Sequence, residues 1–194
     1  MYRPEAIINT SNLEHNVNYI KNYVGKDVTI MPVIKANAYG HGVVQICKIL
    51  YKCGIKGFCV ALLDEVLYLR QNNINHQILH LGSINHNFHK ILLDKNLLLT
   101  INDKEDILFL DKIGKANNHQ FRVHIKIDTG MTRLGILDED TKEIIDMLHS
   151  ATFIKVEGVY TQLSSADEDD QSNTILQREK FIEIANYFSR EFNS

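Results

Sequence analysis

Short apolar, β-branched runs alternate along this chain with segments of helical periodicity. Such alternation is typical of parallel β-strands joined by crossover helices, so it predicts an α/β fold. The runs expected to form strands are Val28–Ala36, Gly57–Leu63, Gln77–Gly82, Leu97–Asn102, Phe121–Asp128 and Val156–Gln162. The segments expected to form helices are His41–Lys52, Asp64–Asn72, Phe88–Leu93, Lys104–Gly114, Asp138–His149 and Asn173–Phe192.

Two α/β architectures produce this alternation, an open doubly wound sheet and a closed (β/α)8 barrel. No GxGxxG motif follows the first expected strand, which disfavours a dinucleotide-binding domain. A closed barrel needs eight strands and about 250 residues. This chain has 194 residues. We therefore expect a partial (β/α)8 TIM-type barrel over residues 28–194, made of about the first six βα units.

Residues 1–27 are expected to form a strand and a helix that lead into the barrel. In "TSNLEHNVNYI", Ser11 is expected to cap the helix and Glu14 to complete a capping box. The preceding "EAIINT" is strand-like but belongs to no βα unit.

Composition excludes several classes of partner. The net charge is −3 and the pI about 6.3, without a basic run, so neither nucleic acid nor an anionic membrane is expected as a partner. No apolar run approaches the ~18 residues of a membrane span, and the N-terminus does not resemble a secretory signal. The chain has three cysteines, Cys47, Cys53 and Cys59, without CxxC spacing, so we expect neither a zinc site nor disulfide bonds. We expect Cys47 and Cys59 to be buried thiols of a cytoplasmic protein.

The stretch "FRVHIKIDTG" separates apolar from polar residues by strand alternation. His124, Lys126 and Asp128 share the face opposite the valine and isoleucines, so they are expected to point into the barrel. Such a trio can instead contain a buried ion pair, of Lys126 with Asp128 or with a neighbouring carboxylate. The loop "TGMTRLG" then places Arg133 after the strand, where barrel enzymes carry functional groups.

Lys35, in "MPVIKANAYGHG", is expected to end the first strand, at the C-terminal rim. Its stem can pack on apolar surface while its amine reaches water. Alternatively its amine is a nucleophile, because burial lowers the pKa of lysine and a neutral amine reacts with carbonyl groups. The turn after it is by itself a plain strand-to-helix connection that uses glycine.

Three motifs together resemble the alanine racemase family. "VIKANAYGHG" is similar to the family's attachment motif for pyridoxal 5′-phosphate (PLP), "KIDTGMTRLG" to a second motif, and "VEGVYTQLSSADE" to a third. They follow the family's order and spacing over nearly the whole chain. Serine racemases of the same superfamily carry a similar first motif, so alanine and serine both stay open as substrates.

The resemblance implies a role for each matched residue. Lys35 would hold PLP as a Schiff base and act as one of two bases that exchange the substrate α-proton. Tyr39 would contact the cofactor phosphate. Arg133 would hydrogen-bond the phenolic oxygen of the cofactor and help place the substrate carboxylate. Lys126 matches a position that is carbamylated in some members, where the new charge orients that arginine.

For the whole protein, the resemblance implies a PLP-dependent isomerase that interconverts L-alanine and D-alanine by α-proton transfer. It also implies a cytoplasmic homodimer that supplies D-alanine for peptidoglycan, with no metal ion. Two other interpretations stay open. One is a PLP-binding or assembly fragment without catalysis, and the other is a piece of a metabolic barrel in which Lys35 is structural.

The chain departs from the family in two respects. Gln162 stands where the family normally has a histidine that bonds an arginine beside the pyridine nitrogen; glutamine keeps a donor and an acceptor but has no titratable charge. Family members also continue into two more strands and a C-terminal β-domain. We expect this chain to be part of a longer racemase and incomplete for full activity, because the second base and much of the phosphate site would lie in that part.

Overall fold

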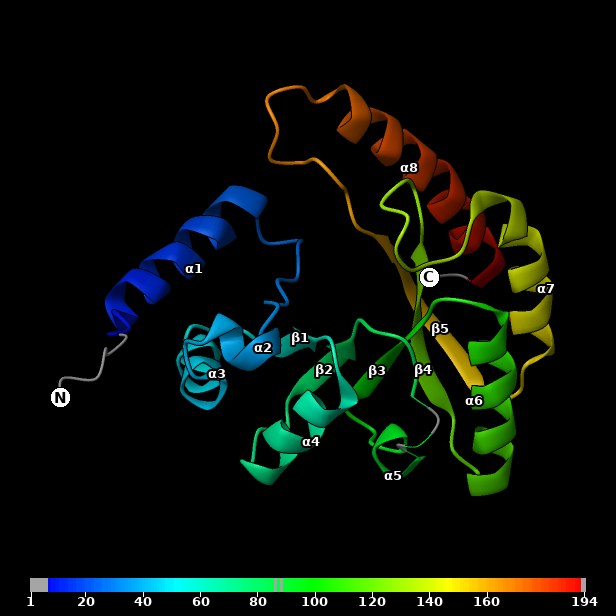
Figure 1. The fold of residues 1–194 in the computed structure, drawn as a ribbon, viewed down its shortest axis with the longest axis horizontal. Coiled ribbons are helices and arrows are strands. Elements are labelled where there is room, and N and C mark those ends of the chain that lie inside the picture. Colours follow the sequence, from blue (N-terminus) through cyan, green and yellow to red (C-terminus); the bar gives the residue numbers. More distant parts are fainter. Residues whose placement is uncertain (1–6, 86, 88, 193–194) are drawn as a thin grey trace, which may run out of the picture. The chain divides into compact units, whose positions relative to one another are not determined.

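The computed structural model describes residues 7–85, 87 and 89–192. By its internal contacts the chain divides into two compact units, Met1–Leu81 and Gly82–Ser194. The elements of the first unit are α1 (Thr10–Val24), α2 (Lys35–Tyr39), α3 (Val43–Lys52), β1 (Gly57–Val60), α4 (Leu63–Gln71) and β2 (Gln77–His80). Those of the second are α5 (His89–Leu92), β3 (Leu97–Ile101), α6 (Lys104–Asn117), β4 (Phe121–Ile127), η1 (Asp138–Asp140), α7 (Thr141–Ser150), β5 (Ile154–Thr161) and α8 (Ser172–Phe192). Figure 1 labels the helices and strands.

In the first unit, β1 and β2 pair in parallel and α4 connects them. The register aligns Gly57 with Gln77 and Val60 with His80. Helix α4 packs against both strands and buries Val66 completely. This βα unit is the support on which the segment around Lys35 rests.

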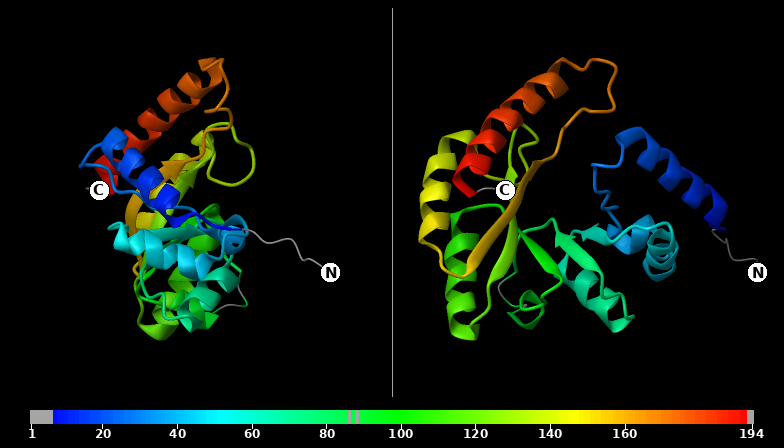
Figure 2. Two further views of the ribbon diagram at one scale, coloured as in Figure 1. Left: turned by 90° about the vertical axis from the view of Figure 1, so that its left-hand side faces the viewer. Right: turned by 180° about the vertical axis from the view of Figure 1, so that it is seen from behind.

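In the second unit, β3, β4 and β5 run parallel in that order. Helices α6, α7 and α8 lie together along one side of these strands (Figures 1 and 2). A register shift between Val123 and His124 marks a bulge against β5. The expected alternation in β4 is confirmed: Val123, Ile125 and Ile127 are fully buried on the apolar face.

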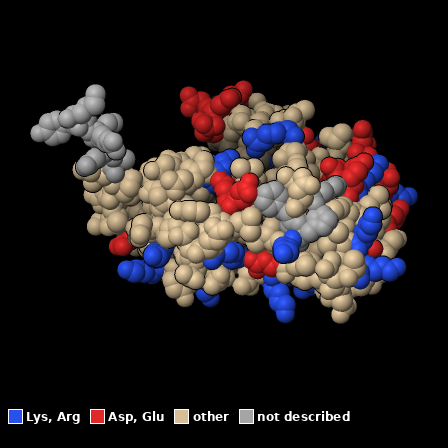
Figure 3. Space-filling view, turned by 60° about the horizontal axis from the view of Figure 1, so that its bottom comes forward, with Lys and Arg blue, Asp and Glu red and all other residues tan. Residues whose placement is uncertain are grey.

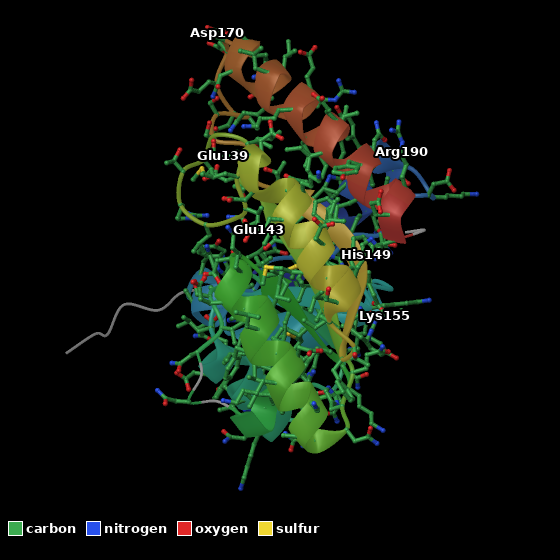
Figure 4. The ribbon with its side chains drawn as sticks, turned by 90° about the vertical axis from the view of Figure 1, so that its right-hand side faces the viewer. Glu139, Glu143, His149, Lys155, Asp170 and Arg190 are labelled. Carbon is green, nitrogen blue, oxygen red and sulfur yellow. The ribbon has the colours of Figure 1, made fainter. Side chains whose placement is uncertain are left out.

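Ion pairs join helices α6, α7 and α8. Lys104 of α6 binds the carboxylate of Glu143 in α7 at 2.5 Å, and His149 of α7 lies 3.1 Å from Glu191 of α8. Figure 4 shows Glu143 and His149 along α7, with Arg190 near the end of the adjacent α8. These groups are partly exposed, so they contribute modestly to stability.

The strand expected near Val28–Ala36 is wrong. The structure has only an isolated bridge there, between Val33 and Cys59. Two backbone hydrogen bonds accompany it, from Ile34 N–H to the Cys59 oxygen and from Cys59 N–H to the Pro32 oxygen, both at 2.9 Å. Proline has no N–H to donate, so the segment cannot form a full ladder. The described residues therefore contain five strands, not six.

The expected cap of the first helix is also wrong. Asn9, not Ser11, caps α1, and its side chain accepts the N–H of Asn12 at 3.1 Å. Of the strand-like "EAIINT", residues 5 and 6 lie outside the described residues, and residues 7–9 form no strand. Helix α3 begins at Val43 instead of His41, because α2 and its glycines occupy the positions before it.

The observed alternation of strands and helices confirms the α/β class. Cys47 and Cys59 are buried, as expected. Acidic and basic side chains are mixed on the face shown in Figure 3. In the part of the chain that the structure describes, no helix is both long and apolar enough to cross a membrane.

Candidate active site

Lys35 opens a turn of unusual backbone conformation. The next three residues have left-handed angles: Ala36 at φ 52° and ψ 48°, Asn37 at 56° and 43°, and Ala38 at 53° and 47°. Tyr39 also has a positive φ, of 52°. Four consecutive non-glycine residues in this region are rare, since L-residues visit it one at a time. Element α2 is thus a left-handed turn, and Lys35 stands at its start. The expectation that Lys35 ends a strand is therefore wrong.

A carboxylate from α4 binds the beginning of this turn. Glu65 accepts the backbone N–H of Ala36 with Oε1 at 2.6 Å. Its other oxygen, Oε2, accepts the N–H groups of Ala61 at 2.9 Å and Leu62 at 3.0 Å. Glu65 therefore ties the turn to the N-terminus of α4, an end of a helix that favours negative charge.

Asn37 holds the other end of the turn. Its backbone oxygen accepts the N–H groups of Gly40 and Gly42, both at 3.1 Å. Its side-chain Oδ1 accepts the N–H of Val43 at 2.9 Å, which satisfies a free donor in the first turn of α3. Gly40 and Gly42 have φ of 87° and 89°, a region where glycine is favoured. The turn is thus hydrogen-bonded at both ends within the first unit.

The structure brings Lys35 and Tyr39 together. The Nζ atom of Lys35 lies 5.9 Å from the centre of the Tyr39 ring, within the range of a cation–π contact. Lys35 is half-buried and Tyr39 is exposed. An amine and a phenol are therefore available side by side on the surface of this unit.

Lys126 lies at the end of β4 and is 4% exposed. Its Nζ donates to the backbone oxygen of Leu134 at 2.9 Å. Burial lowers the pKa of Lys126, the charge of Arg133 lowers it further, and Asp128 partly opposes both. Within the described residues, Lys126 forms no ion pair within 4.0 Å with Asp128 or with any other carboxylate, so the expectation of a buried ion pair is wrong.

Asp128 instead folds the loop that carries Arg133. Its Oδ1 accepts the N–H groups of Gly130 at 2.9 Å and Thr132 at 3.0 Å. Burial raises the pKa of Asp128, but these N–H groups and the charge of Lys126 outweigh it and hold the pKa below its ordinary value. Arg133 is exposed at the tip of this loop.

The base of the same loop closes through backbone contacts. Asp128 donates its N–H to the Ile136 oxygen at 2.9 Å, and Ile136 donates to the Lys126 oxygen at 2.8 Å. Between them Gly135 has a φ of 119°, and a Cβ there would lie 3.0 Å from backbone atoms of Asp128 and Lys126. Only glycine fits this position. Lys126 and the Arg133 loop therefore form one hydrogen-bonded structure in the second unit.

Gln162 follows β5 and is exposed. Its Nε2 donates to the oxygen of the adjacent Leu163 at 3.0 Å. The loop after it is fixed to α8 by Gln177, which is 2% exposed and accepts the N–H and hydroxyl of Ser164 at 3.0 and 3.1 Å. The third motif is thus anchored through Gln177, a residue to which sequence reasoning assigned no role.

Glu65 was likewise missed. It is the third residue of α4, the position where a glutamate can bond back to the start of its helix. That pattern in "LLDEV" was detectable, although Leu62 offers no polar cap of its own. Its contact with Ala36 was not detectable, because the two residues are 29 positions apart.

The side chains present fit the functional groups of PLP. The half-buried amine of Lys35 can bond an aldehyde carbon, and the exposed phenol of Tyr39 can donate to a phosphate. In the second unit, the exposed guanidinium of Arg133 can donate to an oxyanion. Each unit thus carries donors of a kind that an anionic aldehyde can use.

Comparison with known proteins places these features in a family. The model of the alanine racemase N-terminal domain matches residues 8–193. The chain is 36% identical over 179 residues to the alanine racemase of Halothermothrix orenii, and 39% identical over 177 residues to that of Carboxydothermus hydrogenoformans. These alignments cover 92% and 91% of this chain and 47% of each relative. The chain thus spans about half the length of the curated relatives it matches.

Solved structures give the same result for the fold. The alanine racemase of Clostridium difficile 630 superposes with a TM-score of 0.85 at 33% identity, over 93% of this chain and 47% of that one. A Bacillus anthracis alanine racemase with bound L-Ala-P gives the same TM-score, identity and coverage. The expected partial barrel fold is confirmed, and the chain belongs to the alanine racemase N-terminal domain family.

Proposed function

We propose that this chain forms the PLP-bearing barrel portion of an alanine racemase, which interconverts L-alanine and D-alanine. Membership of the family supports this function. The observation that carries it is the position of Lys35, a half-buried residue, at the start of a hydrogen-bonded left-handed turn. Strained backbone of this kind is concentrated at functional sites.

Each matched residue has a proposed role. Lys35 holds the cofactor covalently and takes or returns the α-proton on one face of the substrate. Tyr39 donates to the cofactor phosphate. Arg133 donates to the phenolic oxygen of the cofactor and to the substrate carboxylate, and Gln162 contributes an uncharged contact near the ring. When bound, PLP supplies the electron delocalisation that lets the α-proton leave.

Lys126 is proposed to become a carbamate. Its lowered pKa favours the neutral amine that reacts with carbon dioxide. The carbamate would place a negative charge beside Arg133 and orient its guanidinium. We propose that the whole protein is an enzyme, a cytoplasmic homodimer that provides D-alanine for peptidoglycan.

Cofactor attachment tests the proposal. The purified chain is incubated with PLP, reduced with borohydride and digested, and the modified peptide is identified by mass spectrometry. We expect the pyridoxyl group on Lys35 and its loss in Lys35→Ala. Attachment to Lys126 or to surface lysines alone, or no attachment, would contradict the assignment.

Substrate preference needs a second measurement on the loaded chain. Deuterium uptake at the α-carbon is compared for both enantiomers of alanine and of serine. One base suffices for exchange of a single enantiomer, so exchange does not require full racemisation. Faster exchange of alanine supports alanine as the substrate, and faster exchange of serine would show that serine is the preferred substrate instead.

A further inference from the structure

The left-handed turn after Lys35 is a strained structure that needs support. Left-handed backbone is sterically unfavourable for an L-residue, and Ala36 and Ala38 have no side-chain polar group to offset this cost. Such a conformation persists only when surrounding contacts fix it. The start of the turn, at Lys35 and Ala36, therefore needs a contact that fixes it.

The backbone on both sides of Lys35 is bound to the β1–α4 unit. On one side, Ile34 donates its N–H to the oxygen of Cys59, in β1, at 2.9 Å. On the other side, Ala36 donates its N–H to Glu65, in α4, at 2.6 Å. The N–H of Ala36 belongs to the peptide group that also contains the carbonyl of Lys35. Fixing this group restrains the ψ angle of Lys35. The peptide group before Lys35 is held by the N–H of Ala38, which donates to the Ile34 oxygen at 2.9 Å, so the backbone that directs the lysine side chain is bound on both sides.

Glu65 is suited to this because it is itself held in place. One oxygen bonds Ala36, while the other bonds Ala61 and Leu62 at the start of its own helix. Charge-assisted hydrogen bonds of this kind are about twice as strong as neutral ones. The carboxylate therefore holds the start of the turn in a fixed position relative to α4.

We propose that Glu65 is a positioning residue for Lys35, which directs the amine toward the bound cofactor by holding the N–H of Ala36. The proposal rests on the proposed function of Lys35 as the cofactor-binding amine. A glutamate that served only α4 would need the bonds to Ala61 and Leu62 but not the bond to Ala36.

Glu65→Asp separates these two roles. We expect aspartate, which is one methylene shorter, to keep its charge at the start of its own helix and to withdraw from Ala36. Glu65→Gln is the second variant; it keeps the length but can accept with only one oxygen. The matched control is Asp64→Asn, which removes an exposed carboxylate from the same first turn.

The first measurement needs no cofactor. Amide hydrogen exchange is followed by NMR in the full chain, together with the nuclear Overhauser contact between the side chains of Lys35 and Tyr39. In Glu65→Asp we expect the Ala36 amide to exchange at least about tenfold faster and the Lys35–Tyr39 contact to weaken, while Leu62 changes little. In Asp64→Asn both stay as in the parent. Unchanged protection of Ala36 in both Glu65 variants would refute the proposal.

The second measurement is borohydride trapping of PLP on Lys35 at a fixed, limiting PLP concentration. We expect trapping to fall about tenfold in Glu65→Asp and less in Glu65→Gln, at an unchanged thermal midpoint, and to be unaffected in Asp64→Asn. Equal trapping in parent and Glu65→Asp, with the Ala36 amide released, would show that Glu65 does not position the lysine. If the parent itself carries no pyridoxyl on Lys35, the proposed function fails, and the exchange and Overhauser measurements still decide whether Glu65 directs the side chain.

Discussion

The side-chain nitrogen of Lys126 donates a hydrogen bond to the carbonyl oxygen of Leu134 at 2.9 Å, across the base of the loop that carries Arg133. A residue on a barrel strand is thereby fastened to the residue that follows the arginine. A change in the charge of Lys126 therefore alters a hydrogen bond that holds this loop.

Lys126→Met is expected to change how stability depends on pH. Because burial lowers its pKa below 10.5 in the folded chain, folding at neutral pH includes the cost of burying a charge. As pH rises through the lowered folded pKa toward the unfolded one, the folded state releases its proton first and this cost disappears. At pH 7 the free energies of unfolding of the parent and of Lys126→Met should differ by no more than about 1 kcal/mol. In the alkaline range the free energy of unfolding of the parent should rise relative to that of the variant.

Urea unfolding in carbon dioxide-free buffers measures this, and the difference between parent and variant removes the contribution of other alkaline groups. A parent curve parallel to that of Lys126→Met would show that the lysine is not buried as a charge.

Arg133→Ala should reduce retention of PLP much more than it reduces stability. The side chain is exposed at a loop tip, so we expect a loss of at most about 0.5 kcal/mol in the free energy of unfolding. Loss of a charged hydrogen bond to the cofactor would instead weaken retention roughly tenfold or more. Dialysis followed by absorbance and thermal melting separates the two effects.

Arg178→Ala, which removes an exposed arginine from α8, is the matched control for charge. Equal cofactor retention in Arg133→Ala and Arg178→Ala would mean that Arg133 only solvates its loop.

Glu157→Gln should destabilise the second unit in a pH-dependent way. Arg122 binds both oxygens of Glu157, at 3.0 and 2.7 Å. The hydrogen bonds from Arg122 lower the pKa of Glu157 from 4.5 to about 2, with Lys155 adding to the effect. A carboxylate with a depressed folded pKa stabilises the protein above its unfolded pKa and loses this contribution as pH falls through the folded one.

We expect the variant to be about 1 kcal/mol less stable than the parent at pH 7 and the two to converge toward pH 2, as measured by urea unfolding. Glu179→Gln, at an exposed position in α8, controls for the loss of charge. A pH-independent difference would assign the effect to packing.

Gly114→Ala tests the packing of α6. Alanine is the better helix former by about 1 kcal/mol, so helix propensity alone predicts stabilisation. In the structure, however, a Cβ at this position would lie 2.4 Å from the Cβ of Phe153 and 2.7 Å from the backbone oxygen of His119. Relieving such a clash costs about 1–3 kcal/mol, so the variant should melt at a lower temperature than the parent. A higher midpoint would show that the neighbouring loop yields freely.

The sequence predicted the second unit better than the first. In β4, alternation alone identified the buried apolar face correctly, because successive side chains of a strand point to opposite faces. The helix at Lys104 was also found, since its apolar period is regular and Asp103 caps it.

The errors lie around Lys35 and have a physical cause. An apolar run such as Val28–Ala36 looks the same whether it pairs fully or meets a neighbour at one bridge, and Pro32 was the only local signal against a strand. Alanine prefers the right-handed region, so nothing local in Ala36 or Ala38 predicts a left-handed turn. The start of the turn is instead hydrogen-bonded to a carboxylate from another element, Glu65 of α4. At the N-terminus, Asn9 and Ser11 are both good caps, and only the geometry distinguishes them.

The separation of 29 residues between Ala36 and Glu65 has a consequence for the order of folding. The turn gains its partner only after a loop of that length has closed, which is slow compared with the formation of a local helix. Strand β1 and helix α4 must therefore assemble before Lys35 acquires a fixed direction. A partly folded chain in which β1 and α4 have not yet assembled therefore presents this lysine as an ordinary flexible amine.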